Sequence, residues 1–327
     1  MNDSEFNTAG AKERIEVKEK KIQIPPQIYR LIVMVVLVAA AAIFVPRFAS
    51  YSNILNLVRQ IFLLAMLGYG MALSMLIGGL DLSIGSVAAL STVFAGSLIS
   101  QGHVIPGVLT GLVIGVGIGL LNGVMIGLVK LPDFIMTFSM MYIARGFALT
   151  YTQGQSFFNY PKSFTWIGKS FIGPVPVTAI ISLVILLILY FLLYRTTFGR
   201  ALYAVGSSKQ AARYTGLSVS RKVIQVYALS GLIAAIAGLV YIARLNSADA
   251  DLGQLWPLEA IAVCVIGGVT FVGGEGNIAG LLVGAVVVAI ISNCINLLGI
   301  PPRFQDFFTG FVIILAVAVD HYTKKRE

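Results

Sequence analysis

The chain has 327 residues, of which 57% are hydrophobic and 11% are charged. Soluble domains contain about 25% charged residues, so a soluble fold of this length could not cover so much apolar surface. The net charge of +9 does not indicate a nucleic-acid partner, because the basic residues follow a membrane topology, as described below. The apolar runs lack the period-two alternation of a membrane barrel, and they therefore predict an all-α, polytopic helical bundle.

The chain starts with a charged segment, residues 1–28, which we predict to be a solvated tail. Residues 29–321 then form a transmembrane domain, and residues 322–327 form a second tail. Since about 20 apolar residues cross a bilayer, we predict about ten transmembrane helices with glycine-rich breaks. The predicted spans are 29–48, 54–77, 82–100, 104–128, 133–153, 174–194, 223–243, 258–273, 277–298 and 304–321.

Lysine and arginine residues predict the orientation of these spans, because they concentrate on the cytoplasmic side of a membrane. With the amino terminus inside, the inner segments contain 16 of the 23 basic residues and the outer segments contain six. Arg145 alone falls within a span, where it could pair with Glu259. Both termini are therefore predicted to be cytoplasmic.

Glycine recurs at every fourth position in "TGLVIGVGIGLLNGVMIG", from Gly111 to Gly127, and again at 276, 280 and 284. This spacing places the glycines on one helix face, where a neighbouring backbone can approach closely. The face could serve packing alone, or it could let one helix slide against another. No phosphate-binding loop is present, so the sequence shows no energy source of its own.

The stretch "IGGLDLSIGS", residues 77–86, interrupts the apolar sequence with a carboxylate. A buried charge in a membrane is costly and by default indicates function or an internal partner. Asp81 and Ser83 could simply cap the following helix. Alternatively, Gly78 and Gly79 could open a break that exposes polar groups to a central cavity.

A related stretch, "VGGEGNIAGL", starts at Val272 and repeats the glycine pair and the acidic residue. Two such breaks suggest two equivalent gates, as in transporters with internal duplication. Polar residues scattered within the spans suggest a neutral, hydroxylated ligand. The predicted pathway or gate residues are Gly78, Gly79, Asp81, Ser83, Asn122, Gly273, Gly274 and Asn293.

Residues 195–222, "RTTFGRALYAVGSSKQAARYTGLSVSRK", form the largest internal polar segment after the amino-terminal tail. Ser207 or Ser208 could cap a short helix through Lys209–Thr215, and Gly216 would end it. A helix of two turns is unstable alone in water. It therefore needs a surface to pack on, either its own bundle or a partner.

Four motifs stand out in the chain: "GGLDLSIGS", "FGRALYAVGSSKQAARYTGLSVSRKV", "ALSGLIAAIAGLVYIARLNSA" and "EAIAVCVIGGVTFVGGEGNIAGLLVGA". Together they resemble the permease subunits of bacterial ATP-binding-cassette importers for monosaccharides, with the autoinducer-2 importer as close kin. The resemblance covers residues 30–320. It implies an inner-membrane protein that transports a pentose or hexose without hydrolysing ATP. It also implies a second permease copy, a periplasmic sugar-binding protein and a cytoplasmic, tandem ATP-binding subunit.

In this family a cytoplasmic helix couples the permease to the ATPase, and "GRALYAVGSSKQAARYTG" is the similar segment here. The resemblance implies that the coupling residues are Gly199, Arg200, Gly206, Ser208, Lys209, Ala211, Ala212 and Gly216.

Two other functions are compatible with a membrane bundle. An ion-coupled secondary transporter or facilitator could use Asp81, Arg145 and Glu259 as a relay, although carboxylates are few. An intramembrane enzyme would need a nucleophile with a base or a metal set. Neither pattern is present, and the two cysteines each lie alone in apolar runs, so we predict no catalytic residues, metal or cofactor.

Overall fold

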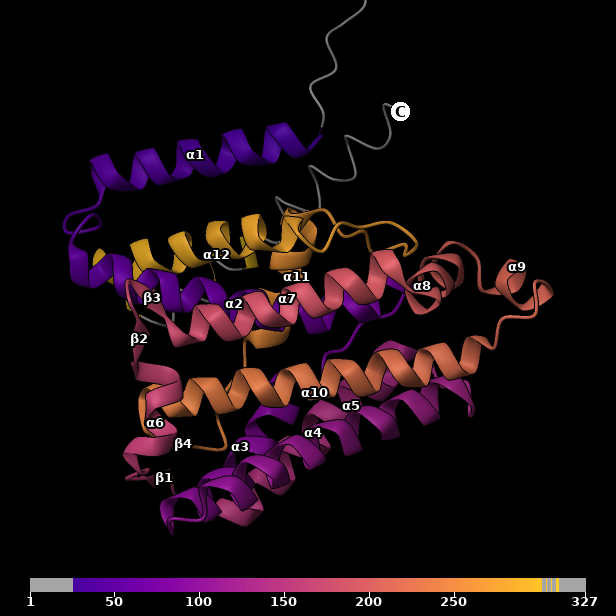
Figure 1. The fold of residues 1–327 in the computed structure, drawn as a ribbon, viewed down its shortest axis with the longest axis horizontal. Helices are drawn as coiled ribbons and strands as arrows, with labels where there is room; N and C mark the ends of the chain where they lie inside the picture. Colours follow the sequence, from indigo (N-terminus) through magenta and orange to yellow (C-terminus); the bar gives the residue numbers. More distant parts are fainter. Residues whose placement is uncertain (1–25, 302–303, 305–306, 308–309, 312–327) are drawn as a thin grey trace, which may run out of the picture.

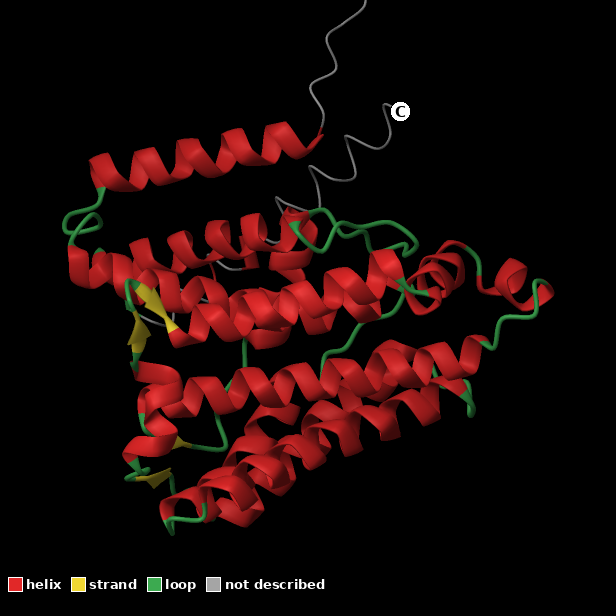
Figure 2. Ribbon diagram, in the orientation of Figure 1, coloured by secondary structure: helices red, strands yellow, loops and turns green. Residues whose placement is uncertain are grey.

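The computed structural model describes residues 26–301 together with residues 304, 307, 310 and 311. Within them the chain is a bundle of helices, with only short strands and connecting loops between them (Figure 2). The helices are α1 (Pro26–Phe44), α2 (Tyr51–Leu76), α3 (Ile84–Ser100), α4 (Val104–Gly127), α5 (Asp133–Thr152), α6 (Lys162–Lys169), α7 (Val177–Arg195), α8 (Thr197–Ser207), α9 (Lys209–Tyr214), α10 (Val219–Leu245), α11 (Trp256–Gly267) and α12 (Gly280–Leu297).

The predicted class, a helical membrane protein, agrees with these elements. Five described helices, α2, α4, α7, α10 and α12, are long and apolar enough to cross a membrane. Nine of the ten predicted spans coincide with a helix, and the tenth, 304–321, lies almost wholly outside the described residues. The count of ten therefore stays a prediction.

The span predicted at 258–273 is the clearest disagreement with the structure. Helix α11 has only 12 residues, a length of about 18 Å, which is too short to cross a bilayer. It ends because Gly268 adopts a left-handed conformation, with φ of +91°, which favours glycine at a helix end. The residues that follow form a loop up to α12.

Helices α4 and α10 form a close contact through the predicted glycine stripe. The buried face of α4 consists of glycines and Asn122. A Cβ atom added to Gly119 would lie 3.0 Å from the Cα of Ala228 in α10, so only glycine permits this approach. The packing interpretation of the stripe is therefore confirmed, and α10 is held against α4 along most of its length.

Two features mark opposite ends of the bundle (Figure 1). At one end, α8 and α9 project beyond the long helices. At the other end lie α6 and two short antiparallel strand pairs. Strand β1 (Phe157–Phe158) pairs with β4 (Ser247–Ala248), and β2 (Phe171–Ile172) pairs with β3 (Val175–Pro176). Helix α6 and the four strands were not predicted from the sequence as separate elements.

Candidate functional site

The first predicted break lies between α2 and α3. Helix α2 ends at Leu76, and Gly78 follows with φ of +68°. The amide of Gly78 still donates to the Met75 carbonyl at 2.9 Å, and that of Gly79 donates to the Ser74 carbonyl at 2.9 Å. These bonds satisfy carbonyls at the end of α2, and the chain then leaves the helix axis before α3 begins at Ile84.

Asp81 is buried in this break, with 1% of its surface exposed. One carboxylate oxygen accepts hydrogen bonds from the Ser83 amide at 3.1 Å and the Ser83 hydroxyl at 2.6 Å. The other oxygen accepts from the Ser230 hydroxyl of α10 at 2.7 Å. The predicted cap is therefore half right, because Asp81 binds an amide at the start of α3, whereas the Ser83 side chain makes no capping bond.

Asn122 extends this arrangement to a further helix. Its amide nitrogen donates to the Ser83 hydroxyl at 2.9 Å from the buried face of α4. Its side-chain oxygen is buried and has no hydrogen-bond partner among the described residues. We call Asp81, Ser83, Asn122 and Ser230 the Asp81 network. It joins the start of α3 to α4 and α10, with neutral groups donating to one carboxylate.

The residue before Asp81 is held by a second set of contacts. The amide of Leu80 donates to the Asp133 carboxylate at 2.8 Å. The carbonyl of Leu80 accepts from the hydroxyls of Tyr227 and Thr137, each at 3.2 Å. We call Asp133, Thr137 and Tyr227 the Leu80 clamp. Both backbone groups of a residue in the break are thus satisfied by side chains of α5 and α10, as burial requires.

The second break, residues 268–279, joins α11 to α12 and lies against the first. Gly273 and Gly274 adopt φ of +88° and +75°. The amide of Gly274 donates to the Leu76 carbonyl at 2.9 Å. A Cβ added to Gly273 would lie 2.6 Å from the Gly78 nitrogen. The two glycine pairs found in the sequence therefore meet in space.

The predicted coupling segment forms two consecutive short helices at the projecting end of the molecule (Figure 1). The Thr196 hydroxyl caps α8 by accepting from the Gly199 amide at 3.4 Å. The Ser208 hydroxyl caps α9 by accepting from the Ala211 amide at 3.2 Å. The predicted cap at Ser208 is confirmed. Gly216, with φ of +82°, follows the end of α9 as predicted.

The predicted coupling residues separate into two groups. Five of them are exposed: Arg200, Ser208, Lys209, Ala211 and Gly216. Gly199 and Ala212 are buried, and Gly206 is half-buried against the two breaks. The exposed group leaves a basic surface that ends in Tyr214, of which 82% is exposed.

Asn293 is the predicted pathway residue that lies apart from the others. It exchanges two hydrogen bonds with Asn53 of α2, at 2.9 and 2.8 Å. It is the fourteenth residue of α12, about 20 Å along the helix from the second break. The structure therefore gives Asn293 a partner that joins α12 to the first turn of α2.

Four residues of this site were missed as site residues from the sequence: Asp133, Thr137, Tyr227 and Ser230. Asp133 occupies the first turn of α5, where an acidic residue needs no explanation beyond the helix dipole. Tyr227 and Ser230 are single polar groups within an apolar run, a pattern that also fits packing.

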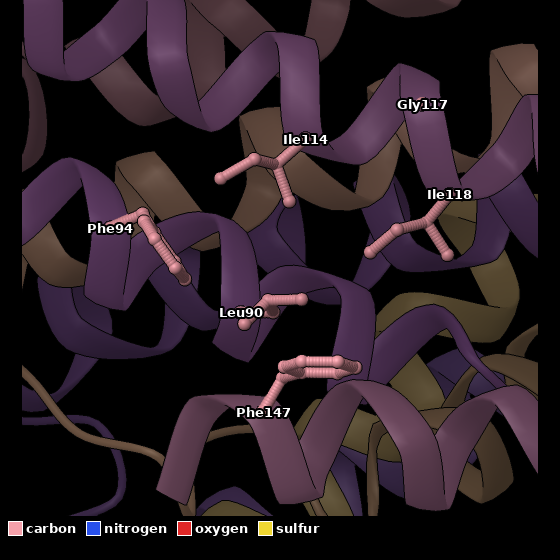
Figure 3. A pocket seen from close by; sticks show the side chains of 6 residues that line it. All are labelled: Leu90, Phe94, Ile114, Gly117, Ile118 and Phe147. Atoms are coloured by element: carbon pink, nitrogen blue, oxygen red, sulfur yellow. The ribbon is translucent and has the colours of Figure 1, made fainter. Parts of the chain in front are cut away.

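Two recesses in the described part of the chain are lined by apolar residues and contain none of the predicted site residues. The first has a volume of about 360 Å³ and lies among α3, α4 and α5 (Figure 3). Its lining is Leu90, Phe94, Ile114, Gly117, Ile118 and Phe147. A hydroxylated ligand would find no polar side chain there.

A membrane bundle with two contacting glycine breaks and a basic projecting element is compatible with a transport subunit. Residues 53–317 match the family described as the permease component of the branched-chain amino acid transport system. The match covers most of the chain, and the protein belongs to this family. A comparison with solved structures finds no match.

Curated relatives extend the similarity over most of each chain. The chain is 35% identical to the ribose import permease protein of Bacillus subtilis, over 94% of this chain and 98% of the relative. It is 34% identical to the fructose import permease protein of Rhizobium meliloti, over 92% and 86%. It is 32% identical to the D-allose transport system permease protein of Escherichia coli, over 85% and 86%. The predicted resemblance to sugar import permeases is confirmed.

Proposed function

We propose that this protein is the permease subunit of an ATP-binding-cassette importer that moves a monosaccharide across the bacterial inner membrane. The observation that carries the proposal is similarity, over most of the chain, to permeases named for ribose, fructose and allose import. The site is compatible with it, because most of the polar groups around Asp81 are neutral hydroxyls and amides, and the second carboxylate at the break, Asp133, binds the Leu80 amide.

The proposed organisation follows the charge distribution and the helices together. Residues 29–321 form the permease domain in lipid, between cytoplasmic tails at 1–28 and 322–327, and its transmembrane helices are the predicted spans other than the short α11, which covers only part of the bilayer. The projecting end with α8 and α9 then faces the cytoplasm, and the end with α6 and the strand pairs faces the periplasm. A second copy of the chain, or a close relative, completes the pathway.

The projecting element is the proposed docking site for a separate, tandem ATP-binding subunit. A partner could approach the exposed side chains of Arg200, Lys209 and Ala211 without unfolding the bundle. Buried Gly199 and Ala212 would hold the element on the bundle. The permease itself would not hydrolyse ATP.

Transport would proceed by alternating access. ATP binding would close the two ATPase domains and displace α8 and α9 of each permease copy. The breaks at residues 77–83 and 268–279 would then change position, and the pathway would change sides. A sugar-loaded periplasmic binding protein would give direction by binding the two states with different affinities.

Reconstitution in proteoliposomes tests the proposal. The permease, its ATP-binding subunit and its binding protein should take up sugar only when ATP is hydrolysed. Arg200→Glu should reduce both uptake and retention of the ATP-binding subunit. Lys162→Glu, an exposed charge reversal on α6 at the opposite end, is the control and should retain that subunit fully. Uptake driven by an ion gradient without the ATP-binding subunit would contradict the proposal.

A further inference from the structure

The last turn of α8 lies against both glycine breaks at once. A Cβ added to Gly206 would clash with the Leu76 carbonyl oxygen of the first break and with the backbone of Gly274 in the second. A Cβ added to Gly273 would lie 3.2 Å from the Gly206 carbonyl oxygen. Three backbones therefore meet at a point where no side chain fits.

Tyr203, one turn earlier in α8, makes a directional contact with the second break. Its hydroxyl donates to the Gly276 carbonyl at 3.0 Å. Burial raises the pKa of Tyr203, and its neighbour Tyr194 raises it further. The hydroxyl therefore remains protonated at any physiological pH and keeps its ability to donate.

The two breaks are also joined directly to each other by the hydrogen bond from the Gly274 amide to the Leu76 carbonyl. The last turn of α8 thus rests on a unit that contains the end of α2 and the loop before α12. Helix α8 is continuous over 11 residues. A displacement of its exposed face therefore moves its last turn by a similar distance.

We propose that Tyr203 and Gly206 are positioning residues for transport, which hold both breaks in one place relative to α8 so that a movement of α8 and α9 shifts the two together. This inference rests on the proposed function. It adds Tyr203, and it gives Gly206, one of the predicted coupling residues, a role that needs no contact with the sugar or the ATP-binding subunit. Gly206 permits the close contact between α8 and the two breaks, and the hydrogen bond from Tyr203 fixes the position of α8 relative to the second break.

Tyr203→Phe tests the inference because it removes one hydroxyl and keeps the ring that packs near Tyr194. The readout is the number of sugar molecules taken up per ATP hydrolysed by the reconstituted complex. Loss of a hydrogen bond to a half-buried carbonyl should lower this ratio by about threefold to tenfold. Tyr142→Phe, on the exposed face of α5, is the matched control and should leave the ratio unchanged.

A second measurement reports the position of the break itself. Val272 is 82% exposed, so Val272→Cys in a background with Cys294→Ser should react readily with a maleimide. In the complex, trapping the ATP-bound state should change the labelling rate, and Tyr203→Phe should remove most of that change.

The outcomes separate this inference from the proposed function. A purely structural role for Tyr203 would lower uptake and ATP hydrolysis together, so an unchanged ratio with an unchanged labelling response would overturn the inference alone. A wild-type complex that takes up no sugar with ATP would overturn the proposed function and this inference with it.

Discussion

Replacing Asp81 should destabilise the break between α2 and α3 by an amount that depends on the substituent. The carboxylate accepts three hydrogen bonds in a site with 1% exposure. Asp81→Leu leaves the Ser83 amide, the Ser83 hydroxyl and the Ser230 hydroxyl without their acceptor, at about 1–3 kcal/mol each. Serine hydroxyls can rotate to helix carbonyls, so we expect a total loss of about 3–6 kcal/mol in folding free energy.

Asp81→Asn is the conservative counterpart. The amide oxygen can accept from Ser83, and the amide nitrogen can donate to the Ser230 hydroxyl, which accepts as well as donates. Every group then retains a partner, and only the strengthening of the bonds by charge is lost. We expect a cost of about 1–2 kcal/mol. Ser230→Ala, which removes one donor from the carboxylate, should cost about the same.

Heating in detergent followed by size-exclusion chromatography measures the stability of the variants, and uptake in proteoliposomes measures transport. We expect both stability and uptake to decrease in the order wild type, Asp81→Asn, Asp81→Leu. If Asp81→Leu matched the wild type in stability, the three contacts would not hold the break. If it also matched in transport, Asp81 would have no part in the gate. Loss of transport in a stable Asp81→Asn protein would instead assign the role to the charge.

Two further predictions concern helix packing and use the same stability assay. Gly123→Ala should cost about 1–3 kcal/mol, because the new Cβ would lie 2.7 Å from the Cα of Ile224 in α10. The control is Gly117→Ala, whose new Cβ would have nothing within 4 Å and which should be neutral or stabilising by up to about 1 kcal/mol. Equal losses of stability in the two variants would contradict the packing role of the glycine stripe. Asn53→Ala and Asn293→Ala should each cost about 1–3 kcal/mol. The double variant should cost no more than the less stable single variant, since each substitution removes the same two hydrogen bonds between the pair. Additive losses of stability would show that the two side chains do not act as a unit.

Local patterns in the sequence were sufficient to predict much of the fold. The length of the apolar runs located nine helices, and the four-residue spacing of glycine identified the face of α4 that packs on α10. The cap at Ser208 and the termination near Gly216 depend on a few neighbouring residues. Such features are local, and the structure contains them at the predicted positions.

The contacts of the site could not be predicted, because they join distant parts of the chain. Ser230 lies 149 positions from Asp81, and Tyr227 lies 147 positions from Leu80. Nothing in the surrounding apolar sequence distinguishes these residues from polar groups that only join helices. The short helix α11 was predicted as a longer span because the apolar sequence continues past Gly268, whereas the helix ends there.

The contact between the two breaks changes what should be expected of them. The sequence suggested two equivalent gates, and this would allow each gate to move while the other stayed still. The Gly274 amide donates to the Leu76 carbonyl, and Gly273 packs on Gly78, so moving one break alone would leave buried backbone groups unpaired, at about 1–3 kcal/mol for each. We therefore expect a single gate built from two segments. A substitution that displaces either segment should then alter the nucleotide-dependent exposure of the other by a similar factor.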